Sequence, residues 1–349
     1  MIRFTSDYIA TCHPAILDAL AAGNFDPQPG YGKDAHCAEA ADLARALCRA
    51  PNAAVHFVGG GTQANMLACT AAMRPHQTVL AVETAHIFQH ETGAIEAAGH
   101  KVTALPGTLG KISAEQVRRA VEDHNTSPDY DQIVKPKMVY ISHPTEYGTL
   151  YTAAELRALR DVCREFNLIL YADGARLGYG LCAKGTDVDL PLLAECCDAF
   201  TIGGAKLGAM FGEAIVITDK NSLLNEDFRL IMKQRGAMLS KGWVLGVQFK
   251  TMLAGGEEGL YFSGARHAIK LAGRLAEGFE KHGIPLLMPP ATNQIFPVIS
   301  HEKLDKLGEK YLFEEWEPVD EGHRAVRFCT SWSTREEDVE ALLADLAGL

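Results

Sequence analysis

The sequence predicts an α/β protein with a mostly parallel central sheet, helices on both faces of that sheet, and a small C-terminal α+β domain. Short runs rich in Val, Ile and Leu alternate with segments whose apolar residues recur at helical spacing. The runs are apolar throughout, which is typical of parallel strands buried on both faces. From about residue 221 the chain changes to long helices and sparser strands. In the 349-residue chain we therefore expect a large domain over residues 1–250 and a small domain over residues 251–349.

The expected elements alternate regularly before residue 221. Helical segments cover 35–50, 63–73, 114–124 and 153–166. Strand-like runs cover 53–58, 78–83, 137–142, 168–173, 199–204 and 212–218. Farther along, helices are expected over 222–253, 258–281 and 334–347, with strands around 284–288, 294–299 and 325–330.

The composition excludes several classes of partner. A formal net charge of −11 and a pI near 5.6 argue against nucleic acid or an anionic membrane. No apolar run approaches the ~20 residues that cross a bilayer, and the N-terminus lacks the apolar core of a signal peptide. The nine cysteines form no CxxC pair and no zinc spacing, so we expect free thiols, no metal site and a cytoplasmic location.

A run of three glycines follows the strand-like segment 53–58, and Thr62 opens the next helical segment. Glycines let the backbone approach an anion, and a helix N-terminus offers unpaired N–H groups with a partial positive charge. Gly60, Gly61 and Thr62 are therefore candidate phosphate ligands, with a tight turn and a helix cap as the alternative. The Walker and dinucleotide fingerprints are both absent, which disfavours a nucleotide-binding protein.

Asp173 ends an apolar strand-like run, where the functional edge of an open α/β sheet lies. A carboxylate there needs a partner, because burying an unpaired charge is unfavourable. A protonated pyridine nitrogen would be such a partner, and the ring would then act as an electron sink. Arg176, three residues on, could bind a carboxylate in bidentate fashion. The alternative is a structural ion pair between Asp173 and Arg176.

Lys206 lies among glycines and small residues after a second strand-like run, with no acid within four positions. Partial burial lowers the pKa of an amine and makes it a better nucleophile and proton carrier. A lysine in an exposed glycine loop is the alternative. The order of Asp173, a helix, a strand and then Lys206 makes the pair more informative than either residue alone.

His86 follows another strand-like run, and its flat imidazole could stack on an aromatic cofactor. His90, one helical turn farther, could line the same pocket. A histidine in this position is often only a packing or capping residue, and no HExxH metal pattern is present.

Together these residues resemble the threonine aldolases, which are pyridoxal phosphate (PLP) enzymes of the β-eliminating lyase group with the aspartate-aminotransferase fold, fold type I. The resemblance extends over essentially the whole chain. It is carried by the SD pair at Ser6, the YGKD stretch at Tyr31, GGGTQAN, ETAHI, PTEYGTLY at 144–151, DGAR at 173–176, GGAKLG around Lys206 and RFCTSWST from Arg327.

The resemblance implies one role for each matching cofactor residue. Lys206 would hold PLP as a Schiff base, Asp173 would pair with the pyridine nitrogen, and His86 would stack on the ring. Gly60, Gly61 and Thr62 would hold the phosphate. Lys233 or Arg235 would also reach the phosphate, in some such enzymes from a neighbouring subunit.

The resemblance also implies a reaction and an assembly. Residues that would bind the amino-acid substrate are Ser6, Tyr31, Arg176 and Arg327, with Arg176 also close to the cofactor. The reaction would be low-specificity retro-aldol cleavage of L-threonine and L-allo-threonine to glycine and acetaldehyde. The enzyme would be a homotetramer with active sites shared between subunits, and segment 1–35 would lie near them.

The chain departs from the family pattern at the group that handles the substrate hydroxyl. Many threonine aldolases carry ENTHN where this chain has SHPTEYG, which contains His143 and Glu146. Another fold-type-I PLP lyase or aminotransferase acting on a small amino acid is the alternative, since the same scaffold supports several reactions. A non-catalytic protein that keeps the fold is a second alternative.

Overall fold

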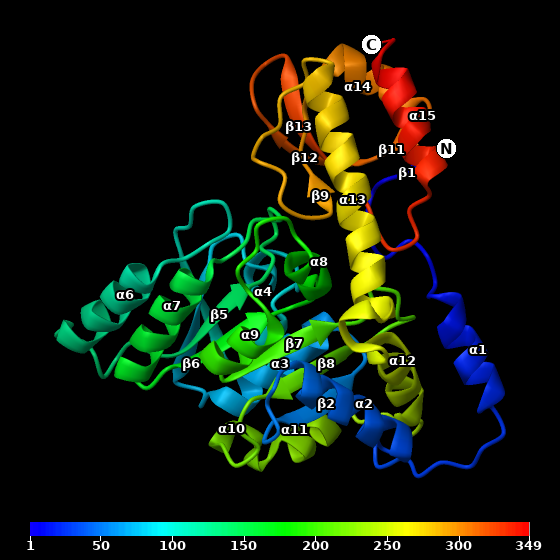
Figure 1. Cartoon of the computed structure of the whole chain (residues 1–349). Coiled ribbons are helices and arrows are strands. Elements are labelled where there is room, and N and C mark those ends of the chain that lie inside the picture. The colour runs from blue at the N-terminus through cyan, green and yellow to red at the C-terminus, as the bar shows by residue number, and fades with distance from the viewer. Residues whose placement is uncertain (349) are drawn as a thin grey trace.

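Seven strands form the central sheet (Figure 1). The computed structural model describes residues 1–348, and within them the strands lie in the order β2–β8–β7–β6–β5–β3–β4. β8 is antiparallel to both neighbours, and the other adjacent strands are parallel. The bounds are Ala54–Val58 (β2), Gln77–Val82 (β3), Lys101–Leu105 (β4), Lys135–Ser142 (β5), Ile169–Asp173 (β6), Ala199–Gly203 (β7) and Glu213–Ile217 (β8).

Helices cover the sheet, as the α/β prediction requires. One layer, side by side in Figure 1, consists of α6 (Ala114–Thr126), α7 (Ala153–Glu165) and α9 (Leu190–Cys196). The other contains α3 (Gly61–Ala72), α5 (Ala94–Ala97), α10 (Leu223–Glu226) and α11 (Phe228–Gln234). α7 shows why such segments are helical: Thr152 and Glu155 form a capping box, and Leu156, Leu159 and Val162 form one buried stripe.

A third group of helices packs beside the edge strand β2. It consists of α1 (Pro14–Ala22), α2 (Ala35–Leu47) and α12 (Trp243–Leu253). The short helices α4 (His86–Gln89) and α8 (Leu177–Leu181) follow β3 and β6, and a 3-10 turn covers Gly256–Glu258. No helix within residues 1–348 combines the length and apolarity that crossing a membrane requires.

The C-terminal part is a smaller α+β unit at the end of the long helix α13 (Figure 1). Its antiparallel strands follow the path β10–β13–β12, and β9 also pairs with β13. The elements are α13 (Leu260–Lys281), β9 (Gln294–Ile295), β10 (Val298–Ser300), α14 (His301–Gly308), β11 (Tyr311–Leu312), β12 (Glu314–Pro318), β13 (His323–Cys329) and α15 (Glu336–Leu346).

The N-terminal strand β1 (Ile2–Arg3) pairs in parallel with β11, which joins the N-terminal segment to the C-terminal unit. Phe4 belongs to the second hydrophobic core, together with Leu275, Phe279 and Phe328 of the C-terminal unit. Residues directly after Phe4 are thereby held beside the central sheet. Helix α13 contributes to both cores, and the division of the chain at residues 250 and 251 stays a prediction.

Two sequence-based assignments differ from the structure, and some elements, among them α1, α9, α14, β4 and β12, were not predicted. The helix expected over 222–253 is divided into α10, α11 and α12. The break between α11 and α12 falls at Gly236, whose positive φ of 72° a right-handed helix cannot continue. The strand expected at 284–288 is only an isolated bridge at Leu286, beside Pro285, which lacks a backbone donor. Strand β4 was missed because it lies at the edge of the sheet and is only partly buried.

Candidate active site

A cavity of about 310 Å³ lies at the edge of the sheet where β5 and β6 end. The carboxyl ends of parallel strands meet at one edge, so residues far apart in sequence converge there. The cavity brings together seven of the residues predicted from sequence: Gly60, Gly61, Thr62, His86, Asp173, Arg176 and Lys206.

Asp173 ends β6, and three donors hold its carboxylate. Asn65 Nδ2 and the Tyr140 hydroxyl donate to Oδ2 at 2.8 and 2.7 Å, and the Ala175 amide donates to Oδ1 at 2.9 Å. Burial alone would raise the pKa of Asp173, but these hydrogen bonds, together with nearby His86, hold it below its usual value. The side chain is therefore an anion at neutral pH, suited to a protonated ring nitrogen.

His86 begins the short helix α4, and a buried acid fixes its ring. Nδ1 of His86 lies 2.8 Å from Oε1 of Glu91, whose side chain is fully buried. Asn65 Nδ2 donates to the same Glu91 oxygen at 2.8 Å, which links the imidazole to Asp173. The His86 side chain is 38% exposed and lines the cavity, so it can present its ring to a ligand.

Lys206 lies three residues after the end of β7, and the close packing of β7 against the turn after β6 requires glycine at Gly203. A Cβ on Gly203 would lie 2.5 Å from the Ala175 carbonyl oxygen, so only glycine fits where β7 passes the turn after β6. Burial and the nearby Arg176 lower the pKa of the Lys206 amine, although Asp7, Asp173 and Glu213 oppose the shift. A lowered pKa favours the neutral, nucleophilic amine.

Glu213 begins β8 and lines the same cavity, although it was not predicted from the sequence. Burial and the charge of Asp173 raise its pKa well above the usual value, against the opposing effect of Lys206. Its Oε2 atom is buried without a hydrogen-bond partner in the part of the chain that the structure describes. A single acid opening the apolar run EAIVI was the available signal, because strands buried on both faces rarely carry a charge.

The glycine turn provides open space at the N-terminus of α3. Gly60 is the cap residue, and within residues 1–348 no side chain caps the helix; the Thr62 hydroxyl does not do so. A Cβ added to Gly60 or Gly61 would meet no atom within 4 Å. Because Gly60, Gly61 and Thr62 line the cavity, this open space can admit a ligand, and an anion suits a helix N-terminus.

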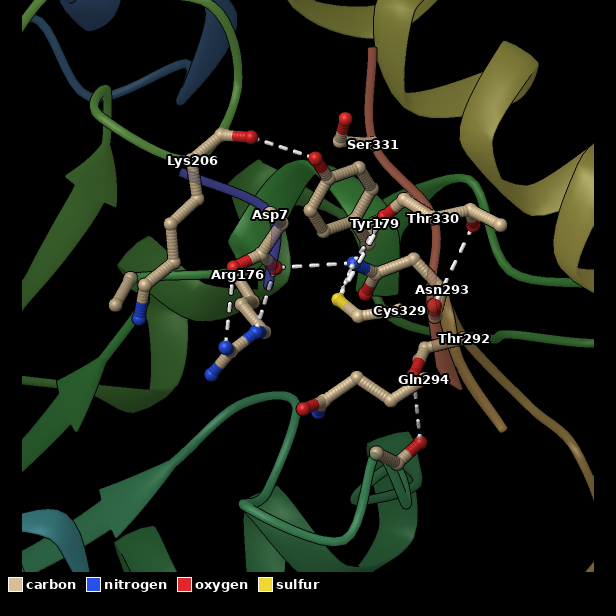
Figure 2. Close-up of polar contacts among 12 residues, drawn as sticks. Asp7, Arg176, Tyr179, Lys206, Thr292, Asn293, Gln294, Cys329, Thr330 and Ser331 are labelled. Atoms are coloured by element: carbon tan, nitrogen blue, oxygen red, sulfur yellow. Dashed lines mark hydrogen bonds and ion pairs between the residues drawn. The ribbon is translucent and has the colours of Figure 1, made fainter. Parts of the chain in front are cut away.

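Arg176 is held by Asp7 rather than by Asp173 (Figure 2). Its Nε and Nη2 donate to Asp7 Oδ2 and Oδ1 at 2.7 and 3.1 Å, and Asn293 Nδ2 donates to Oδ2 at 3.0 Å. The ion pair between Asp173 and Arg176 that the sequence left open is therefore not formed. Arg176 pairs instead with Asp7 of the N-terminal segment. Figure 2 shows the side chains of Lys206 and Arg176 extending in the same direction.

Two other predicted substrate residues lie close by but do not line this cavity. Ser6 is buried next to Asp7. Arg327 on β13 donates to Gln294 Oε1 and the Thr5 carbonyl at 3.1 Å each and pairs with Glu314. A substrate carboxylate would have to compete with Glu314 for this arginine.

The remaining predicted residues lie away from the cavity in the single chain. Tyr31 lines a separate hollow, and the Lys233 amine lies 4.7 Å from the centroid of its ring. Arg235 Nη2 donates to the Ala98 carbonyl at 3.1 Å. Their expected contribution to a site shared with a neighbouring subunit stays a prediction.

His143 and His90 also lie outside the cavity. Both ring nitrogens of His143 are buried without a partner among residues 1–348, and burial lowers its pKa to about 4. His90 is exposed, and its ring centroid is 5.7 Å from that of His86.

Comparison with known proteins decides the family. The sequence pattern of the beta-eliminating lyases matches residues 3–310. Low specificity L-threonine aldolases of a Pseudomonas species and of Pseudomonas aeruginosa are each 30% identical over 99% of this chain and 96% of their own length. The chain belongs to the beta-eliminating lyase family. The resemblance seen in the sequence is confirmed.

Solved structures agree with this membership. A threonine aldolase of Leishmania major is 40% identical and superposes with a TM-score of 0.95 over 100% of this lyase and 99% of that chain. An aspartate aminotransferase variant of Thermus thermophilus superposes with a TM-score of 0.71 over 100% of this chain and 91% of its own, at 15% identity, which shows the fold alone. Fold type I is therefore confirmed.

PLP is the cofactor of this lyase, as the family and the fold establish. The residues of the cavity fit that group. Asp173 is an anion without a cationic partner on its own strand, the glycine turn leaves room for a phosphate, and Lys206 is a buried amine of lowered pKa. The chain is thus a PLP-dependent carbon–carbon lyase.

Proposed function

We propose that the chain is a low-specificity L-threonine aldolase. It would cleave L-threonine and L-allo-threonine to glycine and acetaldehyde, and it would cleave phenylserine to glycine and benzaldehyde. The match over nearly its full length to two relatives of that name carries the proposal. The convergence of Lys206, Asp173 and His86 in one cavity supports it. When bound, PLP supplies an electron sink for the pair released from the Cα–Cβ bond.

The cofactor residues have distinct tasks in this proposal. Lys206 would bind the cofactor covalently through its buried amine, and Asp173 would accept a hydrogen bond from the ring nitrogen. His86, fixed by Glu91, would stack on the ring. Backbone N–H groups at Gly60, Gly61 and Thr62 would bind the phosphate at the start of α3.

The substrate residues orient the amino acid. Arg176 uses Nε and Nη2 on Asp7, which leaves Nη1 for the substrate carboxylate. Ser6 and Arg327 would complete the carboxylate site. Holding the carboxylate sets the direction of the Cα–Cβ bond relative to the ring, and such orientation lowers the barrier to cleavage.

The assembly that we propose is a cytoplasmic homotetramer with active sites at subunit contacts. Exposed Tyr31 and the neighbouring Lys233 suit such a contact, and Arg235 would reach the phosphate of an adjacent site. Analytical ultracentrifugation of the holoenzyme tests the tetramer. A monomer with full activity would contradict a shared site.

An aldehyde-release assay tests the activity. The purified holoenzyme should form acetaldehyde and glycine in equal amounts from L-threonine and L-allo-threonine, and Lys206→Ala should lose turnover. Release of ammonia and a keto acid from threonine would instead support a β-elimination reaction. Normal turnover in Lys206→Ala would contradict the mechanism. Turnover of D isomers alone would contradict the stereochemistry.

A further inference from the structure

Glu146 lies in the loop after β5, four residues beyond the last residue of that strand, and it lines the cavity with Lys206 and Asp173. Several neighbouring elements orient it. Its Oε1 accepts from the Ser142 hydroxyl at 2.6 Å and from the His86 amide at 2.9 Å. Its backbone carbonyl accepts from Gln294 Nε2 at 3.4 Å. The carboxyl group is therefore fixed beside the residue that would stack on the cofactor.

The second oxygen of this carboxyl group is not satisfied. Oε2 of Glu146 is buried and has no hydrogen-bond partner within residues 1–348. A buried oxygen without a donor costs free energy, and a ligand hydroxyl would supply the missing hydrogen bond. One oxygen of Glu146 thus holds the side chain in place, while the other has no donor within residues 1–348.

Other polar groups near this loop are hydrogen-bonded within the chain or do not line the cavity. His143 is not among the lining residues, and both its ring nitrogens are buried. The Tyr140 hydroxyl donates to Asp173, and the Thr145 hydroxyl lies 2.7 Å from that of Thr149.

Unpartnered carboxylate oxygens also occur on Asp34, Glu91 and Glu213, but of these three residues only Glu213 lines the cavity. Glu213 pairs in register with Val58 and Gly203, next to the glycine turn that would receive the phosphate. The sheet order separates its strand β8 from β5 by β7 and β6. Glu146, in contrast, lies in the loop after β5, beside the start of α4.

We propose that Glu146 is the catalytic base that takes the proton of the substrate β-hydroxyl. The inference rests on the aldolase function proposed above and names the residue that performs one of its steps. The O–H bond breaks and its proton moves to Glu146 Oε2. The electron pair of that bond forms the C=O bond of the aldehyde as the Cα–Cβ bond breaks. The pair left on Cα then takes up one proton to give glycine, so the step needs no oxidant or further reactant.

The electrostatic surroundings suit this role. Burial and the charge of Asp173 raise the pKa of Glu146, while the hydrogen bonds from Ser142 and the His86 amide lower it. A general base is most effective where its pKa lies near the working pH, and the raised pKa moves Glu146 in that direction. The titratable side chains near it are Asp173 on β6, Tyr140 on β5, His86 on α4, and Tyr147 and Tyr151 farther along its own loop.

The variant Glu146→Gln tests the proton transfer while keeping the hydrogen bonds that hold the side chain in place. The amide oxygen of glutamine can keep the hydrogen bonds from Ser142 and the His86 amide, but the amide nitrogen cannot accept a proton. We expect kcat for L-threonine cleavage to fall by about 10²–10⁴-fold. Glycine binding, and exchange of the glycine α-proton in D₂O followed by NMR, should change little, because neither involves a β-hydroxyl. Glu83→Gln, which removes an exposed carboxylate near the same loop, is the matched control and should keep all three.

A second measurement does not depend on activity. Because burial raises the pKa of Glu146 in the folded chain, the cofactor-free protein should lose stability as the pH rises through that pKa. Glu146→Gln should remove this part of the pH dependence and raise Tm at neutral pH. A lowered Tm would mean that the carboxylate is needed for folding, which would contradict the unsatisfied oxygen.

The outcomes are distinguishable. If Glu146→Gln cleaves threonine with a kcat within tenfold of wild type, Glu146 is not the catalytic base, while the proposed aldolase function still stands. Equal loss of cleavage and glycine exchange would also exclude Glu146 as the base, since it would then only build the site. Wild-type protein that exchanges the glycine proton but releases no aldehyde from β-hydroxy amino acids would overturn the aldolase function itself.

Discussion

Asp7 and Arg176, 169 positions apart in the sequence, form a buried ion pair at the junction of the N-terminal segment, the central sheet and the C-terminal unit. The Asp7 side chain is fully buried, and the charge of Arg176 holds its pKa below the usual value against the opposing effect of burial. Asn293 donates to the same carboxylate from the C-terminal unit. The pair therefore fixes the guanidinium that would bind the substrate carboxylate.

Asp7→Asn should destabilise the protein and weaken substrate binding. Removing one partner of a buried ion pair leaves the other charge uncompensated and typically costs about 3–5 kcal/mol. KM for threonine should rise more than kcat falls, because Arg176 loses its orientation. Urea denaturation and steady-state kinetics measure the two effects. Asp18→Asn, which removes an exposed carboxylate from α1, should change neither, and an unchanged Asp7→Asn protein would contradict the positioning role.

Asn65→Ala should weaken the binding of PLP. Asn65 donates to both Asp173 and Glu91, and its hydrogen bond lowers the Asp173 pKa. A hydrogen bond to a charged group contributes about 1.5–3 kcal/mol, so the cofactor Kd should rise by roughly tenfold or more. Equilibrium dialysis of PLP measures the change. Asn125→Ala on the exposed face of α6 is the control, and equal affinities in the two variants would exclude this role for Asn65.

Gly61→Ala should separate cofactor binding from folding. The added Cβ meets no atom of the chain, so the free energy of unfolding of the apoprotein should stay within about 1 kcal/mol of wild type. The same Cβ would enter the space in front of the helix N-terminus, and PLP affinity should fall by about tenfold or more. Gly273→Ala in α13 also has open space and should leave PLP affinity unchanged. Full affinity in Gly61→Ala would place the phosphate elsewhere.

Ser142→Ala should move the acid limb of the pH profile for threonine cleavage to higher pH. The Ser142 hydroxyl lowers the pKa of Glu146, so its removal raises that pKa. A base must be ionised to accept a proton, and activity is lost as the pH falls through its pKa. The dependence of kcat/KM on pH measures the shift. An acid limb that stays in place in Ser142→Ala would show that another group titrates in this range.

Much of the fold could be predicted because its signals are local. Buried parallel strands such as β5 and β6 are continuous apolar runs, and α7 has its capping box and apolar stripe within thirteen residues. Where the signal was weak, the prediction failed: the half-buried edge strand β4 was not predicted, and the segment 222–253, which a glycine interrupts, was predicted as one helix. Helical periodicity alone does not reveal a positive φ.

The sequence by itself determined the parts of the site that lie at strand ends. A glycine turn after β2, Asp173 at the end of β6 and Lys206 after β7 must meet at one edge, because parallel strands of one sheet end on the same side. The tertiary structure alone decided which partners these groups find. The pairing of Arg176 with Asp7, the burial of Glu213 and the unsatisfied oxygen of Glu146 depend on contacts between segments far apart in the chain. Local patterns carry no information about such contacts, because they arise only when the layers pack.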